Sequence, residues 1–121
     1  MTPEMTNPGM PRHVEVKDGD LTVATAEVTI ASGLAGTART SLYATPGHIR
    51  PGCRRNLVDA VMDLPEVRAS TRLEATVPLG DGELLERLRE RTVDAVTRAA
   101  GSTTLLDATI PATGHPSSPR G

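Results

Sequence analysis

Hydrophobic and polar residues alternate along the first third of the chain, which is the pattern of β-strands with one buried face. A first strand is predicted over residues 13–17. Asp18-Gly19-Asp20 then predicts a hairpin turn, because Asp-Gly accepts the positive φ angles of a tight reversal. Further strands are predicted over 21–31 and 37–45, and the three together predict an antiparallel meander.

The second of these strands changes parity along its length. Leu21 and Val23 occupy odd positions, whereas Val28 and Ile30 occupy even ones. One extra residue in a strand exchanges its two faces, so the change predicts a β-bulge near Ala24–Thr25.

Two later segments have apolar residues at the 3.6-residue spacing of a helix. The shorter helix is predicted over 51–64, and Pro65 is expected to end it. The longer helix is predicted over 81–100, with Asp81 as its N-cap or as an acid in its first turn, and with Gly101 as its C-cap. Its charged face has two pairs at i,i+4 spacing in the favourable order, Glu83–Arg87 and Asp94–Arg98.

Two more strands complete the predicted domain. Residues 68–78 alternate cleanly, and residues 102–110 follow the longer helix. The resulting order is β-β-β-α-β-α-β, an α+β fold. The economical packing for this order is a five-stranded, mostly antiparallel sheet with two helices on one face.

The two ends of the chain lack this periodicity. Residues 1–12 and residues 111–121 are rich in proline, and the second segment also contains glycine and serine. Both are therefore predicted to be disordered tails. The predicted ordered region is a single domain over residues 13–110.

Composition affects the expected stability. Tyr43 is the only aromatic residue among 121. The core must then be built from aliphatic side chains and alanine, and alanine buries little apolar area. A small domain with such a core is only modestly stable, and association into a homodimer would compensate.

The charge and the cysteine content limit the cellular compartment and the kinds of binding partner that we expect. The formal net charge is −2, which argues against general binding to nucleic acid or to an anionic membrane. A single cysteine forms no internal disulfide, as is typical of a reducing compartment. No run of residues is long and apolar enough for a secretory signal or a membrane span, so we expect a cytoplasmic protein without membrane contact.

One segment departs from the pattern of an ordinary small domain. Cys53 is the only cysteine, and it lies where the shorter helix is predicted to begin. Arginines surround it at positions 50, 54 and 55, and His48 precedes them. A helix start has positive partial charge and normally attracts acidic side chains. Arg50, Arg54 and Arg55 there predict a docking point for an anion or an acidic partner.

Three other interpretations of this segment stay open. It is a plain surface loop if its arginines pair with nearby acids. It is a reactive thiol site if the positive field lowers the pKa of Cys53 and His48 acts as the base. It is a single-stranded nucleic-acid site if Tyr43 stacks on bases while the arginines clamp phosphates.

The sequence gives little support for a metal site or a cofactor site. Four residues offer soft or borderline metal ligands, without zinc-site spacing, and we expect no metal: His13, His48, Cys53 and His115. No phosphate-loop or dinucleotide-binding motif is present, and we expect no cofactor. The polar strand face with Arg68, Arg72 and Glu74 is a further candidate working surface.

Our first hypothesis from sequence is a small, non-enzymatic cytoplasmic binding domain. It would form a homodimer and hold a small anion or an acidic protein. The predicted ligand-binding residues are Tyr43, His48, Arg50, Cys53, Arg54 and Arg55. The first alternative is a thiol-dependent enzyme or redox protein using Cys53, and the second is a binder of single-stranded nucleic acid.

Overall fold

A computed structural model describes residues 12–30, 36–45 and 49–111. The two tails predicted to be disordered, residues 1–12 and 111–121, lie outside this part except for Arg12 and Pro111. None of the described helices is long and apolar enough to cross a membrane.

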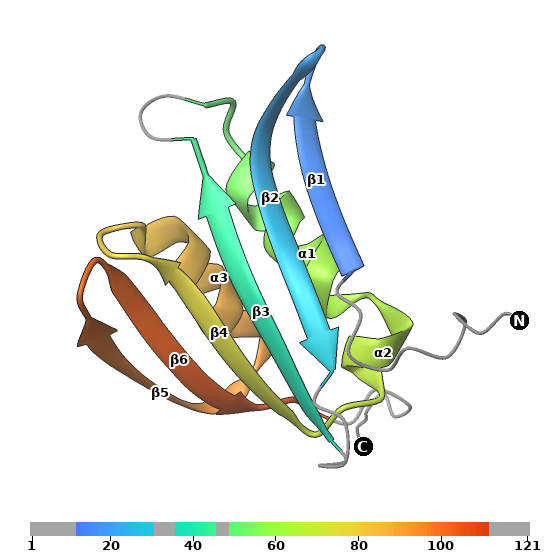
Figure 1. The fold of residues 1–121 in the computed structure, drawn as a ribbon, viewed down its shortest axis with the longest axis vertical. Helices are drawn as coiled ribbons and strands as arrows, with labels where there is room; N and C mark the ends of the chain where they lie inside the picture. Colours follow the sequence, from blue (N-terminus) through green and yellow to red (C-terminus); the bar gives the residue numbers. More distant parts are fainter. Residues whose placement is uncertain (1–11, 31–35, 46–48, 112–121) are drawn as a thin grey trace, which may run out of the picture.

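The described residues form one mixed sheet with helices packed against it (Figure 1). The strands are β1 (Arg12–Asp18), β2 (Leu21–Ile30), β3 (Thr37–Ala44), β4 (Arg72–Pro78), β5 (Val93–Ala100) and β6 (Thr103–Thr109). The helices are α1 (Cys53–Met62), α2 (Pro65–Arg68) and α3 (Gly82–Arg91). The strand order is β1-β2-β3-β4-β6-β5. The prediction of a five-stranded, mostly antiparallel sheet with two helices is therefore wrong.

The N-terminal meander follows the sequence pattern closely. β1, β2 and β3 pair antiparallel, and Gly19 turns the chain between the first two with a φ of 67°. Val16 pairs with Ala24 and Lys17 pairs with Thr22, so Val23 is the extra residue of a β-bulge. The bulge lies one residue before the predicted site, and it lets both Val23 and Ala24 be buried.

The pairing of β3 with β4 is parallel, and this is one source of the wrong sheet prediction. The chain leaves β3, crosses the sheet through α1 and α2, and returns as β4 in the same direction (Figure 1). A helical crossover of this length is the usual connection between parallel neighbours. On its other side β4 pairs antiparallel with β6.

The long helix predicted over 81–100 is two elements. Asp81 caps the start of α3 as predicted, but the helix ends at Arg91 and the chain continues as strand β5. Gly101, predicted as a helix C-cap, instead turns the β5–β6 hairpin with a φ of 64°. The strand β5 forms because it pairs along β6, and that pairing also excludes the predicted helical pair Asp94–Arg98.

The core lies between the sheet and the two longer helices, α1 and α3, which cover the same face (Figure 1). α1 contributes the fully buried Leu57, Val58 and Val61, and α3 contributes Leu84 and Leu88. The strands face them mainly with alanine, valine and leucine. The opposite face of the sheet is covered by none of the described helices.

An ion-pair network joins α1 to α3. Arg87 donates to both carboxylate oxygens of Asp59, at 2.9 and 3.0 Å, and Arg91 donates to Oδ1 at 2.7 Å. Arg91 also bonds Asp63 at 2.9 Å. The two hydrogen bonds from Arg87, together with the weaker effect of the one from Arg91, hold the pKa of Asp59 below its ordinary value, although burial opposes this. Two arginines thus share one partly buried carboxylate.

Asp59→Asn is expected to lower the free energy of unfolding by about 1–2 kcal/mol near neutral pH, because the amide cannot neutralise two guanidinium groups. A depressed folded-state pKa adds stability above the unfolded-state pKa, and this is lost as pH falls through the folded-state pKa. The gap between wild type and variant should therefore close in acid. Urea denaturation near pH 7 and near pH 3 measures it.

Asp63→Asn is the matched control, since the Asp63 side chain is 62% exposed and, among the described residues, pairs only with Arg91. Its loss should change stability by a few tenths of a kcal/mol. Equal effects of the two substitutions would show that the network around Asp59 has no special role.

Candidate functional site

The parallel strands β3 and β4 diverge near the middle of the sheet. Their pairing begins at Thr37 with Arg72 and ends at Ser41 with Thr76. Beyond that point β3 stays with β2 as far as Ala44, while β4 stays with β6 as far as Pro78. A gap therefore opens in the sheet between two strands that each keep an outer partner.

Pro78 explains why the pairing stops. The N–H of Leu79 donates to the carbonyl of Ser102 on the β6 side, at 2.9 Å. Successive backbone amides of a strand point to opposite sides, so the nitrogen of Pro78 faces β3. Proline has no N–H to donate there, and the ladder cannot continue.

A cleft of about 480 Å³ lies at this divergence. Its walls are the end of β3, the first turn of α1 and the loop from β4 into α3. The lining residues are Tyr43, Ala44, Arg54, Pro78, Leu79, Gly80, Asp81, Gly82 and Glu83. Tyr43 and Leu79 are 52% and 54% exposed, so the cleft has apolar side chains open to solvent at its rim.

Arg54 and Asp81 connect the two walls. Nε of Arg54 donates to Oδ2 of Asp81 at 3.1 Å, and Nη2 approaches the carbonyl of Thr45 at 3.3 Å. The other oxygen of Asp81 accepts from the N–H of Leu84 at 3.2 Å and caps α3. The side chains of Arg54 and Asp81 are 16% and 10% exposed. One largely buried pair thus fixes the first turns of both helices beside the cleft.

The structure describes no side chain that caps or neutralises the start of α1. Its N-cap, Gly52, has a φ of 93° and no side chain, and the first turn contains no acidic residue. The amide of Cys53 donates to the carbonyl of Arg50 at 3.2 Å. The amides of Arg54 and Arg55 have no backbone acceptor among the described residues. Free N–H groups at a helix start favour negative charge.

The structure separates the site residues predicted from sequence. Tyr43 and Arg54 line the cleft together. Arg50 pairs with Asp18 of β1 at 3.2 Å, and Arg55 pairs with Glu90 of α3 at 3.5 Å. The arginines therefore point to different acids and do not form one ring.

The other two residues of the predicted site, Cys53 and His48, are not among the residues that line the described cleft. Cys53 is 5% exposed and packs as a small apolar residue. His48 lies outside the described residues, so its predicted role as a base beside the thiol is not addressed by the structure.

Sequence reasoning missed the β4 side of the cleft. The sequence pattern predicts Pro78 as the end of a strand, assigns Leu79 to no element, and predicts Asp81 only as a cap or first-turn acid of a helix. A usable signal was present: a proline in a strand flanked on both sides by others must remove a hydrogen bond from one neighbour.

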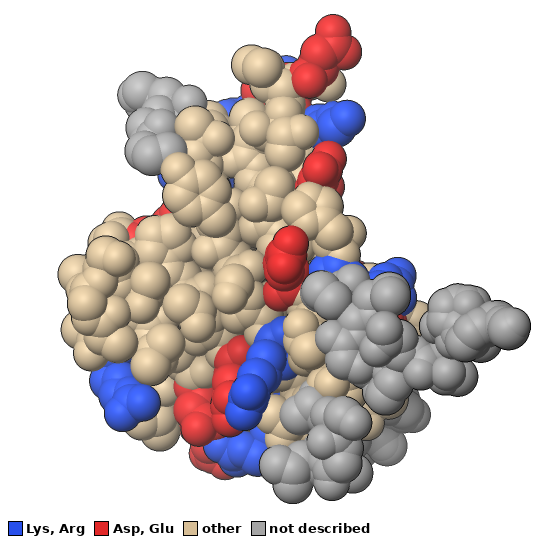
Figure 2. Space-filling view, in the orientation of Figure 1, with Lys and Arg blue, Asp and Glu red and all other residues tan. Residues whose placement is uncertain are grey.

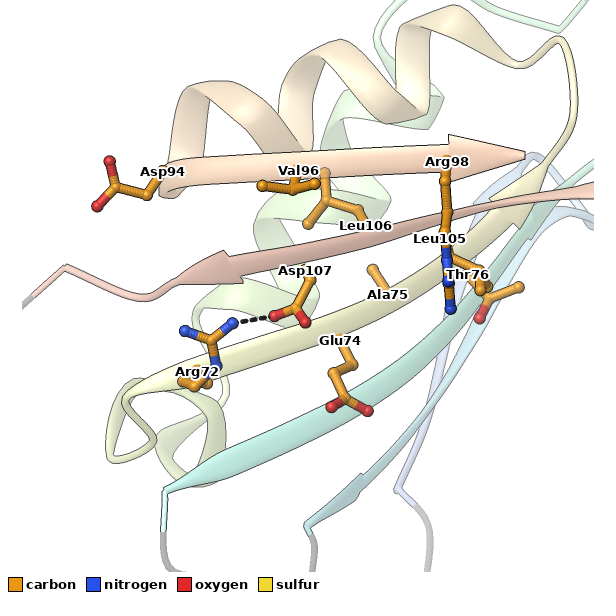
Figure 3. Close-up of a pocket in the computed structure, with 10 residues that line it drawn as sticks. All are labelled: Arg72, Glu74, Ala75, Thr76, Asp94, Val96, Arg98, Leu105, Leu106 and Asp107. Carbon is orange, nitrogen blue, oxygen red and sulfur yellow. Dashed lines mark hydrogen bonds and ion pairs between the residues drawn. The ribbon is translucent and has the colours of Figure 1, made fainter. Parts of the chain in front are cut away.

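A second hollow, of about 560 Å³, lies on the open face of the sheet over β4, β6 and β5 (Figure 3). Arg72 forms an ion pair with Asp107 across its floor, and Glu74 bonds Arg39 of β3 at 2.9 Å. Figure 2 shows acidic and basic side chains alternating on this face, beside a broad area without charge. Among the described residues, no group of three His, Cys, Asp or Glu side chains could hold a metal ion.

Comparison with known proteins identifies the fold. No protein-family model matches the chain, and no curated protein matches it significantly. Solved structures do match it: yncA of Salmonella typhimurium, a proposed acetyltransferase with its cofactor acetyl-CoA, aligns with a TM-score of 0.54 and 15% identity over 84% of this chain and 64% of that protein.

Two further solved structures align with this chain in the same way. A GNAT-family acetyltransferase of Streptococcus pneumoniae aligns with a TM-score of 0.62 and 9% identity, covering 88% of this chain and 70% of its own. The ribosomal-protein-alanine N-acetyltransferase of Brucella melitensis aligns with a TM-score of 0.56 and 15% identity, covering 82% and 67%. The chain therefore has a GNAT-like fold, and it spans less than two thirds of the Salmonella protein.

These neighbours correct the functional prediction. The neighbours named above are described as acetyltransferases, so the prediction of a non-enzymatic binding domain for an anion or acidic partner is wrong. None of the neighbours named above is described as a thiol-dependent enzyme or as a binder of single-stranded nucleic acid.

Proposed function

We propose that this chain is an acyltransferase that binds acetyl-CoA in the cleft between β3 and β4. The observation that carries the proposal is the divergence of the parallel pair beyond Ser41 and Thr76, with the start of α1 beside the opening. The Salmonella neighbour, which has the same fold, is described with acetyl-CoA. The cytoplasmic location expected from sequence stays a prediction.

The residues present fit such a cofactor. Acetyl-CoA has an extended arm with two amides and a charged end with phosphates. The diverging backbones of β3 and β4 leave polar groups that can bond amides as a neighbouring strand would. The amides of Arg54 and Arg55 at the start of α1, which have no backbone acceptor in the part of the chain that the structure describes, suit a phosphate. Asp81, the acid deepest in this wall, is already neutralised by Arg54.

Acetyl-CoA, when bound, supplies an acetyl group activated as a thioester. The exposed faces of Tyr43 and Leu79 would exclude water from the arm of the cofactor between them. Tyr43 is the only residue lining the described cleft that has a hydroxyl group, so we assign its Oη the role of donating a proton to the departing sulfur. Neighbours named for their acceptors, alanine and spermidine, are N-acetyltransferases, and this favours an amine acceptor here.

Titration of the purified chain with acetyl-CoA in a calorimeter tests the proposal. Binding is expected to be saturable and to raise the Tm by several degrees, because a ligand of the folded state stabilises it. Leu79→Glu should weaken binding at least about tenfold, since it puts a negative charge into a cleft for an anionic ligand. An absence of heat and of any Tm change at millimolar acetyl-CoA would contradict the proposal.

Leu21→Glu is the matched control for this substitution. Leu21 is 70% exposed on the β1–β2 hairpin and does not line the cleft. The same charge change there should leave acetyl-CoA binding within about twofold of the wild-type value, because exposed charges at a distance are screened by salt.

A further inference from the structure

The two edges of the sheet differ in how they are protected. Among the described residues, β1 and β5 are the edge strands, each with one partner. Five of the seven residues of β1 have ionisable side chains: Arg12, His13, Glu15, Lys17 and Asp18. Of the eight residues of β5, only Asp94 and Arg98 do. Charged side chains and bulges discourage edge-to-edge pairing, so β1 is protected along its length, whereas β5 has a bulge only near its start, at Asp94, and is open to a partner from Val96 onward.

Most of the exposed side chains of β5 are apolar. Val96 is 67% exposed and Val93 is 45% exposed. Figure 1 shows no described element on the outer side of this strand. An unpaired strand with exposed valines is a template for another strand.

The hairpin geometry decides which backbone groups are free. Ala100 and Thr103 close the two-residue turn, so they bond to each other, and alternate residues back to Val96 also bond β6. The N–H and C=O groups of Thr97 and Ala99 therefore point outward, away from the sheet.

Charge complementarity selects the partner and the register. Asp94, Val96 and Arg98 line the same hollow on the open face (Figure 3). Neither Asp94 nor Arg98 has an ion-pair partner among the described residues. At Asp94 a bulge with a φ of 55° ends the regular pairing and redirects this side chain. One acid and one base thus lie two residues on either side of Val96.

We propose that β5 pairs antiparallel with β5 of a second copy of this chain, about a two-fold axis at Val96. This register brings Asp94 of each copy near Arg98 of the other, on the open face of the sheet. It pairs Val96 with Val96 at the axis. Moving the axis to Thr97 removes both charge pairs, and moving it to Arg98 brings two arginines together.

The resulting dimer has one continuous sheet and an isologous interface. A single short strand pair buries little area, so the dimer is expected to be weak and to depend on concentration. This inference does not depend on the proposed acetyl-CoA cleft, which lies between other strands.

Sedimentation equilibrium of the full chain tests the charge pairs. The wild type should approach twice its 12.7 kDa mass as concentration rises. Arg98→Asp should weaken dimerisation at least about tenfold, because it brings two acids together at each pair. The double variant Asp94→Arg with Arg98→Asp should restore it. Lys17→Asp makes the same charge change on β1 and should have no effect.

A cross-link tests the register. Val96→Cys should form a disulfide-linked dimer on mild oxidation, because facing Cα atoms of such a pair lie within disulfide range. Thr97→Cys should not. The remaining thiol, Cys53, is buried and does not interfere. A monomer at every concentration with no cross-link from Val96→Cys, or cross-linking through Thr97→Cys instead, would overturn the proposal.

Discussion

Asp81→Ala is expected to lower the free energy of unfolding by about 2–4 kcal/mol. The substitution removes the acceptor for the amide of Leu84 and so uncaps α3. It also leaves the guanidinium of Arg54, only 16% exposed, without its acid. An unpaired charge held in a partly buried position is costly, because it has lost water without gaining a partner. Urea denaturation followed by circular dichroism measures the change.

Two further variants separate the cap from the charge. Asn caps a helix as well as Asp does, so Asp81→Asn should keep the cap and cost only about 1–2 kcal/mol. Adding Arg54→Met to Asp81→Asn removes both charges and should recover most of the loss, since an apolar side chain of similar length needs no acid. If this double variant is less stable than Asp81→Asn alone, the guanidinium acts through its bond to Thr45 and not through Asp81.

Leu88→Ala is the second change with a large expected effect, about 2–5 kcal/mol of unfolding free energy. Leu88 is 0% exposed, and with Leu84 it is one of two buried residues on α3. A helix of ten residues has little stability of its own and depends on such contacts. Removing one of its two buried leucines leaves a cavity between α3 and the sheet. Denaturation in urea, with an unchanged m value, would show a loss of stability alone.

Leu85→Ala is the control on the same helix. Leu85 is only partly buried against the core, and the new side chain is the best helix former. Leu85→Ala should lower the free energy of unfolding by less than half as much as Leu88→Ala does. Similar losses at the two positions would contradict the greater packing contribution assigned to Leu88.

The boundary between α3 and β5 shows what the sequence pattern can and cannot decide. A helical stripe with Leu84 and Leu88 continues formally through Thr92 and Val96, so spacing alone predicts one long helix. Composition holds the missing signal. Residues 82–91 contain no β-branched side chain, whereas residues 92–97 contain four, and these favour strands. Pairing with β6 then decides the outcome.

The local elements could be predicted because their causes are local. The Asp-Gly turn, the bulge beside Ala24 and the cap at Asp81 each depend on residues near one another in the chain. The cleft has a different origin. It forms where β3 and β4 stop pairing, and the two strands come from distant parts of the sequence. Alternation does not reveal which strands will be neighbours, so only two of its lining residues, Tyr43 and Arg54, were in the predicted set.

The position of β4 has a consequence for how the chain folds. Each of the other strands in the described sheet pairs with a strand that adjoins it in the sequence through a short connection. By contrast, a helix lies in the sequence between β4 and each of its two partners, β3 and β6. The entropy lost in closing large loops is therefore concentrated at this one strand. The N-terminal meander and the C-terminal hairpin can each form early, and their union along β4 is the event that commits the molecule to its native topology.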